Sequence, residues 1–138
     1  MDRVGRKLPR HVLVRLAAPP DQVTGQAGNR WRRAARLRTR DGRAVLEDYL
    51  RLRRESGRTP RTPEQAAPAL RGSGAICHVP HLETGEVVGM GRLLGDGGWY
   101  FHVVDMALLP AQQRRGIGDA VLAALLDRTR TMAPPAPT

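Results

Sequence analysis

The feature that most restricts the fold is an apolar segment, residues 99–109, followed by two closely spaced glycines and an amphipathic helix. Its composition predicts a largely buried strand that ends at Pro110. Gly116 and Gly118 follow, and apolar residues recur at helical spacing from Ile117 to about Met132. A strand, a glycine turn and a helix in this order predict an α/β fold, built as an α+β layer with the helix packed on a sheet.

The upstream residues predict the other elements of that layer. Apolar positions between Gly42 and Ser56 favour a helix, and Thr62-Pro63-Glu64-Gln65 is typical of a capping box that begins a second helix. Residues 75–81 and 86–94 predict two antiparallel strands, and a Gly-Asp-Gly-Gly turn leads into the third. The expected order is helix, helix, strand, strand, strand, helix.

Positive charge is concentrated at the start of the chain. The net charge is +10, of which residues 1–43 carry +9. This segment is rich in Arg and small residues, so we expect a disordered head over residues 1–43 and a partial folded domain over residues 44–138. The head is either a solvated tail, including one created by a wrongly assigned start codon, or an arm that binds nucleic acid with Trp31 stacked on a base. We favour the tail and do not expect a nucleic-acid partner.

Metal, disulfide and membrane functions find little support. Cys77 is the single cysteine, and the four histidines do not have zinc-ligand spacing. No apolar run approaches the roughly 18 residues that span a bilayer. We therefore expect a cytoplasmic protein without a bound metal.

The glycine turn is the predicted chemical site. Helix N-termini present unpaired N–H groups that favour anions, and Arg114 and Arg115 flank this one. A nucleotide P-loop is excluded because no Gly-Lys-Ser/Thr follows, and Gly89-Met90-Gly91 lacks the third glycine of a dinucleotide fingerprint. The expected ligand is a phosphorylated cofactor.

Residues 113–118 resemble the acetyl-CoA motif of the GNAT superfamily of N-acetyltransferases, Gln/Arg-x-x-Gly-x-Gly/Ala, and the resemblance extends over roughly residues 44–132. It implies a GNAT-like mixed sheet with helices on both faces. It also implies transfer of an acetyl group from acetyl-CoA to a primary amine of a small molecule or an exposed amino group.

The resemblance assigns roles by position. Backbone groups of the strand would pair with the pantetheine arm, and amides of the turn would hold the pyrophosphate while Arg114 and Arg115 face the other phosphates. The residues expected at acetyl-CoA are Met106, Ala107, Leu108, Gln113, Arg114, Arg115, Gly116, Ile117 and Gly118. His102 is the candidate catalytic base, the alternative being a strand histidine bonded to a backbone carbonyl. Asp105 is expected on the opposite face of the strand, as an anchor for a loop.

The sequence departs from the family pattern after Met132. In the family a further parallel strand, a helix and a terminal hairpin follow, and residues 133–138 are too few and too rich in proline to form them. The last strands and helix would then be missing, and the strand over residues 99–109 would have an unpaired edge. We expect a truncated acetyltransferase with little turnover; a degenerate gene product and a homodimer that covers the edge are the alternatives.

Overall fold

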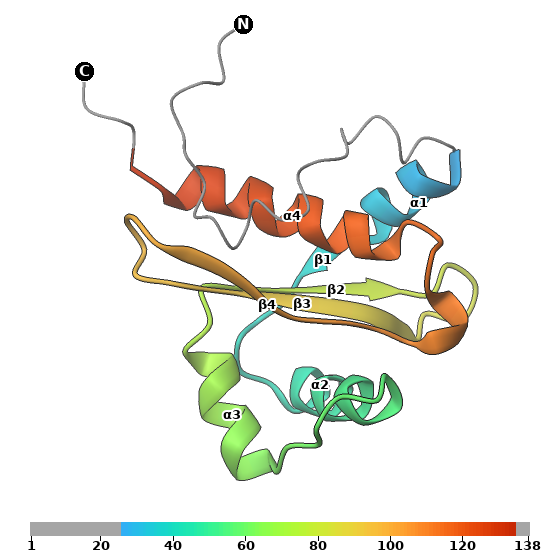
Figure 1. The fold of residues 1–138 in the computed structure, drawn as a ribbon, viewed down its shortest axis with the longest axis horizontal. Coiled ribbons are helices and arrows are strands. Elements are labelled where there is room, and N and C mark those ends of the chain that lie inside the picture. The colour runs from blue at the N-terminus through green and yellow to red at the C-terminus, as the bar shows by residue number, and fades with distance from the viewer. Residues whose placement is uncertain (1–25, 135–138) are drawn as a thin grey trace, which may run out of the picture.

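The structure, a computed structural model, describes residues 26–134, in which a four-stranded antiparallel sheet separates two layers of helices (Figure 1). The strand order is β1-β2-β3-β4, and α1 and α4 cover one face while α2 and α3 cover the other. None of the helices in this range has the length and apolar content needed to cross a bilayer. The elements are α1 (Gln26–Ala34), β1 (Arg36–Leu37), α2 (Arg43–Glu55), α3 (Pro63–Arg71), β2 (Ala75–Pro80), β3 (Val87–Gly95), β4 (Phe101–Leu108), the 3-10 helix η3 (Pro110–Gln112) and α4 (Ile117–Met132).

The helices and strands predicted from residue 42 onward are confirmed. The capping box forms as expected, because Thr62 Oγ1 accepts from the Gln65 amide and the Gln65 side chain accepts from the Thr62 amide. The sheet is antiparallel at every pair of neighbouring strands in the described residues, whereas the resemblance implied a mixed sheet. The reason is local: β2, β3 and β4 are joined by short loops, and a parallel pair needs a much longer crossover.

Two glycines of β3 allow α4 to pack closely on the sheet. A Cβ atom at Gly89 would lie 2.6 Å from Ile117 Cγ2, and one at Gly91 would lie 2.6 Å from Val121 Cγ1. Both distances are shorter than real side chains tolerate, so only glycine permits this contact. Ile117 and Val121 are fully buried there. The start of α4 is thereby fixed beside the first residues of β3 and the carboxyl end of β4.

The expectation of a disordered head over residues 1–43 is wrong for residues 26–43. In this range α1 packs on the sheet with α4, and β1 adds a strand through the pair Arg36 and His78. Trp31 is only 6% exposed in that core, so it is not available to stack on a base. Trp31, Ala34 and Ala35 form a narrow apolar stripe, which is difficult to recognise in the sequence because arginines are so frequent around it. Residues 1–25 lie outside the described residues.

His78 is a buried histidine on β2, at the position that pairs with Arg36 of β1. Its side chain is completely inaccessible, and Nε2 has no hydrogen-bond partner among the described residues. Arg38 Nη1 lies 3.4 Å from Nδ1, and Asp48 Oδ2 lies 4.0 Å from the same atom. Burial, followed by the positive charges of Arg38 and Arg51, lowers the pKa of His78 to about 4.

Because the folded protein takes up this proton only near pH 4 and the unfolded chain near pH 6.5, the free energy of unfolding should fall as the pH drops from about 6.5 towards 4. Urea denaturation of the protein at pH 7.5, 6 and 5 measures this slope. The His78→Gln variant should lose most of it. A variant with an unchanged slope over this range would contradict the assignment to His78.

Candidate active site

An irregularity in β4 shapes the site. Met90 pairs with Ala107 and Arg92 pairs with Val104. One residue therefore lies between the paired positions on β3, whereas two residues lie between them on β4. This extra residue is a β-bulge, and Asp105 within it has a φ of 54°. The prediction that simple alternation sends Asp105 to the face opposite His102 is therefore wrong. The bulge turns the carboxylate toward α2 and α3.

Asp105 joins three side chains from two elements. Its Oδ1 accepts from Arg53 Nη1 at 2.5 Å, and its Oδ2 accepts from Arg92 Nε at 2.6 Å and from the Tyr49 hydroxyl at 2.7 Å. Arg92 Nη1 also donates to the Ala69 carbonyl and to Ser73 Oγ, which extends the network to α3. Asp105 thus anchors two helices to the sheet, rather than the single loop expected from the sequence.

The network fixes the charge of its members. Burial by itself would raise the pKa of Asp105, but hydrogen bonds from Tyr49 and Arg92 and the charges of Arg92 and Arg53 outweigh it and lower the pKa below the ordinary 3.8. Burial, followed by the hydrogen bond to Asp105, raises the pKa of Tyr49 above 10.0. At neutral pH the site therefore contains a carboxylate, a protonated phenol and two guanidinium groups.

The outer edge of β4 carries no other strand in the described part of the chain. The Leu109 amide donates to the Val88 carbonyl, so strand alternation points the backbone groups of Ala107 toward β3 and those of Met106 and Leu108 toward the open edge. Arg58, in the loop between α2 and α3, donates from Nη2 to the Met106 carbonyl. The edge is thus accessible at Leu108 and contacted by a guanidinium at Met106.

The turn after β4 gathers unpaired backbone donors. Arg114 and Gly116 have positive φ angles of 63° and 90°, and the first helical bond of α4 runs from the Ala120 amide to the Gly116 carbonyl. The amides of residues 116–118 precede this bond, so the helix supplies no acceptor for them. Alternating backbone conformations of this kind form an anion-binding concavity, and the positive end of the α4 dipole lies in the same place.

The other predicted residues take different places around this turn. Gln113 is extended and exposed immediately before it, and the Arg114 and Arg115 side chains are exposed. Ile117 is part of the core and is fully buried. A Cβ atom at Gly118 would lie 3.5 Å from the Leu108 side chain, so this glycine lies against the end of β4.

His102 lies away from the turn. It pairs with Leu94 near the start of β4 and is exposed. Met106 is four residues further along the strand, roughly 13 Å at about 3.3 Å per residue. Because Phe101 and Val103 pack in the core on the α4 side, alternation places His102 on the face that carries α2 and α3.

Comparison with known proteins decides the family. A family model described as the acetyltransferase (GNAT) family matches residues 42–133, about two thirds of the chain. The chain belongs to the GNAT acetyltransferase family. This GNAT protein is an N-acetyltransferase, and its acetyl donor is acetyl-CoA. No curated protein matches the sequence as a close relative.

Solved structures support the GNAT fold. A Staphylococcus aureus protein of unknown function, named as a probable acetyltransferase, is 26% identical with a TM-score of 0.60, and the match covers 72% of each chain. A GNAT family acetyltransferase from Streptococcus pneumoniae is 28% identical with a TM-score of 0.57, over 75% of this chain and 77% of that one. A Mycobacterium tuberculosis protein in complex with CoA shares the fold at 21% identity and a TM-score of 0.55, over 70% of this chain and 58% of that one.

Sequence reasoning missed the arginines that surround the bulge of this GNAT domain. Tyr49 and Arg53 are four residues apart on α2, a spacing that places both on one helix face. This spacing was the one sequence feature that could have indicated that the two side chains act together. Nothing in the sequence indicates the contact of Arg58 with Met106, because a loop residue has no periodicity.

The Asp105→Asn variant tests the network. It leaves Arg53 and Arg92 without a counter-charge and should lower the free energy of unfolding by about 2–4 kcal/mol, since breaking a buried ion pair is costly. Asn also tolerates positive φ, so the substitution adds little backbone strain. Because the pKa of Asp105 is lowered, its contribution is present at neutral pH and is lost only as the pH falls through the folded value, below 3.8.

Asp127→Asn is the matched control for urea denaturation at pH 7. Asp127 pairs with Arg130 on the exposed side of α4, with 74% of its side chain accessible, and its loss should cost less than about 0.5 kcal/mol. Equal effects of the two substitutions would contradict the anchoring role of Asp105.

Proposed function

We propose that this chain transfers an acetyl group from acetyl-CoA to a primary amine of a small acceptor, with residues 42–133 as the acetyl-CoA-binding domain. The observation that carries the proposal is the turn of residues 114–118 at the N-terminus of α4, in which Arg114 and Gly116 have positive φ and the last amides precede the first helical hydrogen bond. Turns of this kind bind a diphosphate without a lysine or a metal ion. Here α1 and β1 extend the same fold from its N-terminal side.

The open edge of β4 is the proposed place of the pantetheine arm. Met106 and Leu108 present their backbone groups there, while Ala107 keeps the adjacent residues in register with β3. Binding in this mode is the addition of an extended chain to a sheet edge. Arg58 occupies the Met106 carbonyl in this structure, so its guanidinium has to exchange that contact for another when the arm binds.

The turn is the proposed place of the phosphates. The amides of residues 114–118 face the pyrophosphate, and the exposed side chains of Arg114 and Arg115 add positive charge for the remaining phosphate. Gln113 immediately precedes the turn, and Gly118 allows the first turn of α4 to lie against Leu108. Together these groups place the thioester beside the bulge of β4.

In the reaction a neutral amine attacks the thioester carbonyl, so that the C–N bond forms, the C–S bond breaks and CoA leaves as a thiolate that takes up a proton. Its main requirement is proximity. The fold supplies the rigid bulge against which both reactants are held. Asp105 is a weak base because its pKa is lowered, and Tyr49 cannot accept a proton because it remains protonated. We propose His102 as the final proton acceptor, acting through water because of its distance from Met106 along the strand.

Removal of Arg115 tests the phosphate site. Arg115→Gln should weaken acetyl-CoA binding about 5- to 10-fold at low salt, since it removes a charge from an exposed phosphate contact, and the difference should shrink in 0.5 M salt. Isothermal titration with acetyl-CoA measures the dissociation constant.

Arg128→Gln is the control for this charge, because Arg128 is an exposed arginine further along the same helix. It should change the dissociation constant by less than twofold. The same loss in both variants, or no acetyl-CoA binding by the folded wild-type protein, would contradict the proposed site.

Replacement of His102 tests the proton acceptor. A general base in direct contact contributes about 10²–10⁴ in rate, whereas a residue acting through water at this distance contributes much less. His102→Gln should therefore lower kcat/KM for thiol release by less than about tenfold, with acetyl-CoA affinity unchanged. A loss of 100-fold or more would show that His102 acts directly and that the acetyl group lies nearer the start of β4.

A further inference from the structure

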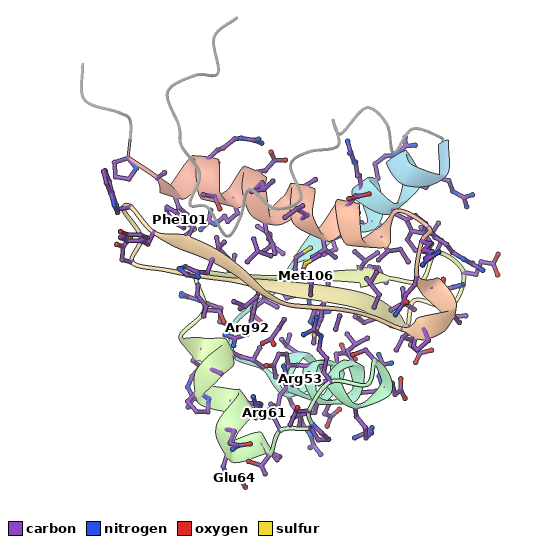
Figure 2. The ribbon with its side chains drawn as sticks, viewed as in Figure 1. Arg53, Arg61, Glu64, Arg92, Phe101 and Met106 are labelled. Atoms are coloured by element: carbon purple, nitrogen blue, oxygen red, sulfur yellow. The ribbon has the colours of Figure 1, made fainter. Side chains whose placement is uncertain are left out.

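A small cavity adjoins the bulge between the sheet and the helices α2 and α3. Its volume is about 160 Å³, below the roughly 300–1,000 Å³ of sites for drug-sized ligands. The polar side chains that line it are Tyr49, Arg53, Arg61, Gln65, Arg92 and Asp105, and two alanines of α3 complete the wall. Figure 2 shows Arg53 and Arg92 between the sheet and the two helices, and Arg61 near the start of α3.

The cavity has an excess of positive charge. Three arginines line it, and Asp105 is the one acidic residue in its wall. Three of the roughly four acceptor positions of that carboxylate are already used, because its two oxygens accept from Arg53, Arg92 and Tyr49. Two formal positive charges therefore remain unbalanced, and Arg61, unlike Arg53 and Arg92, is exposed at the rim of the cavity.

Several donors of these arginines are unused. Arg53 is only 6% exposed, and its Nε and Nη1 donate to Thr59 and Asp105, which leaves Nη2 without an acceptor in the described residues. Arg92 likewise uses Nε and Nη1. Arg61 makes no hydrogen bond or ion pair with any residue in the range 26–134. The cavity thus has more cationic donors than the single carboxylate in its wall accepts from.

The cavity lies next to the proposed acetyl position. Asp105 forms part of its wall, and the next residue, Met106, presents its carbonyl at the open edge of β4. Arg58, which contacts that carbonyl, belongs to the same loop as Arg61. A small molecule in the cavity would therefore contact Asp105, the residue that directly precedes the edge on which the acetyl donor is proposed to lie.

We infer that the acceptor of this enzyme is a small amine that bears a carboxylate, of the amino-acid class, and that Arg61 is the specificity residue that pairs with that carboxylate. Guanidinium groups match the planar fork of a carboxylate and bind it with two parallel hydrogen bonds. The size of the cavity favours a carboxylate over a larger anion. This inference rests on the proposed function, since it assigns the acceptor of the same site.

The test compares ligands that differ only in the carboxylate. N-acetylglycine, N-acetyl-L-alanine and N-acetyl-L-serine, which are products of the inferred reaction, are titrated into the full chain against their primary amides, with ligand-observed NMR as the readout. At least one acid should bind ten times more tightly than its amide. Arg61→Gln should reduce that preference at least fivefold, and Arg71→Gln should leave it within twofold.

Arg71 is a suitable control because it is an exposed arginine at the other end of α3 and does not line the cavity. In thiol release from acetyl-CoA, Arg61→Gln should raise KM for the preferred amino acid and leave kcat within threefold. Equal binding of all acids and amides, or equal effects of Arg61→Gln and Arg71→Gln, would overturn the inference. Absence of acetyl-CoA binding in a separate titration would instead overturn the proposed function.

Discussion

The geometry of the site depends on one carboxylate. Asp105 lies at the extra residue of β4 and binds Arg53 and Tyr49 from α2 and Arg92 from β3. These bonds hold a residue with positive φ in place and keep the bulge from relaxing into a regular strand. The bulge reverses the side-chain alternation for the rest of β4, so Ala107 packs against α2 and α3 while Met106 and Leu108 pack on the α4 side. The open edge at Met106 and the cavity beside it are two consequences of this single arrangement.

A second constraint places the N-terminus of α4 relative to that edge. With no side chain at Gly89 or Gly91, Ile117 and Val121 sit directly on β3, and the N-terminus of α4 lies close to the end of β4. The turn that connects them is short, and it reaches the helix only through positive φ at Arg114 and Gly116. Unpaired amides are the result of this tight connection. One extended ligand can thus contact the strand edge and the helix N-terminus together, which fits a molecule with a long arm and a diphosphate.

The sequence was sufficient for elements with strong local signals. The capping box at Thr62, the apolar stripe of α4 and the glycine turn at 116–118 were predicted, and the family followed from the last of these. The bulge at Asp105 has no such signal, because it depends on partners 13, 52 and 56 residues away. α1 was missed because its arginines outweigh a narrow stripe around Trp31, whose burial depends on contacts with the sheet. The antiparallel pairing of β2 and β3 was predicted from their short connection, and the parallel strand that makes the family's sheet mixed was expected only after residue 132.

The positive charge of the cavity also bears on the need for a base. An amine that enters beside Arg53, Arg61 and Arg92 meets more positive than negative charge, and this disfavours the ammonium form relative to the neutral amine. The environment therefore favours the nucleophilic form before any side chain removes a proton, which explains how a site could function with His102 far along the strand. A carboxylate on the same acceptor offsets the repulsion that the amine alone would experience. With the proposed acceptor, one set of charges would both select the molecule and favour its neutral amine, while Asp105 offsets the repulsion between Arg53 and Arg92 within the fold.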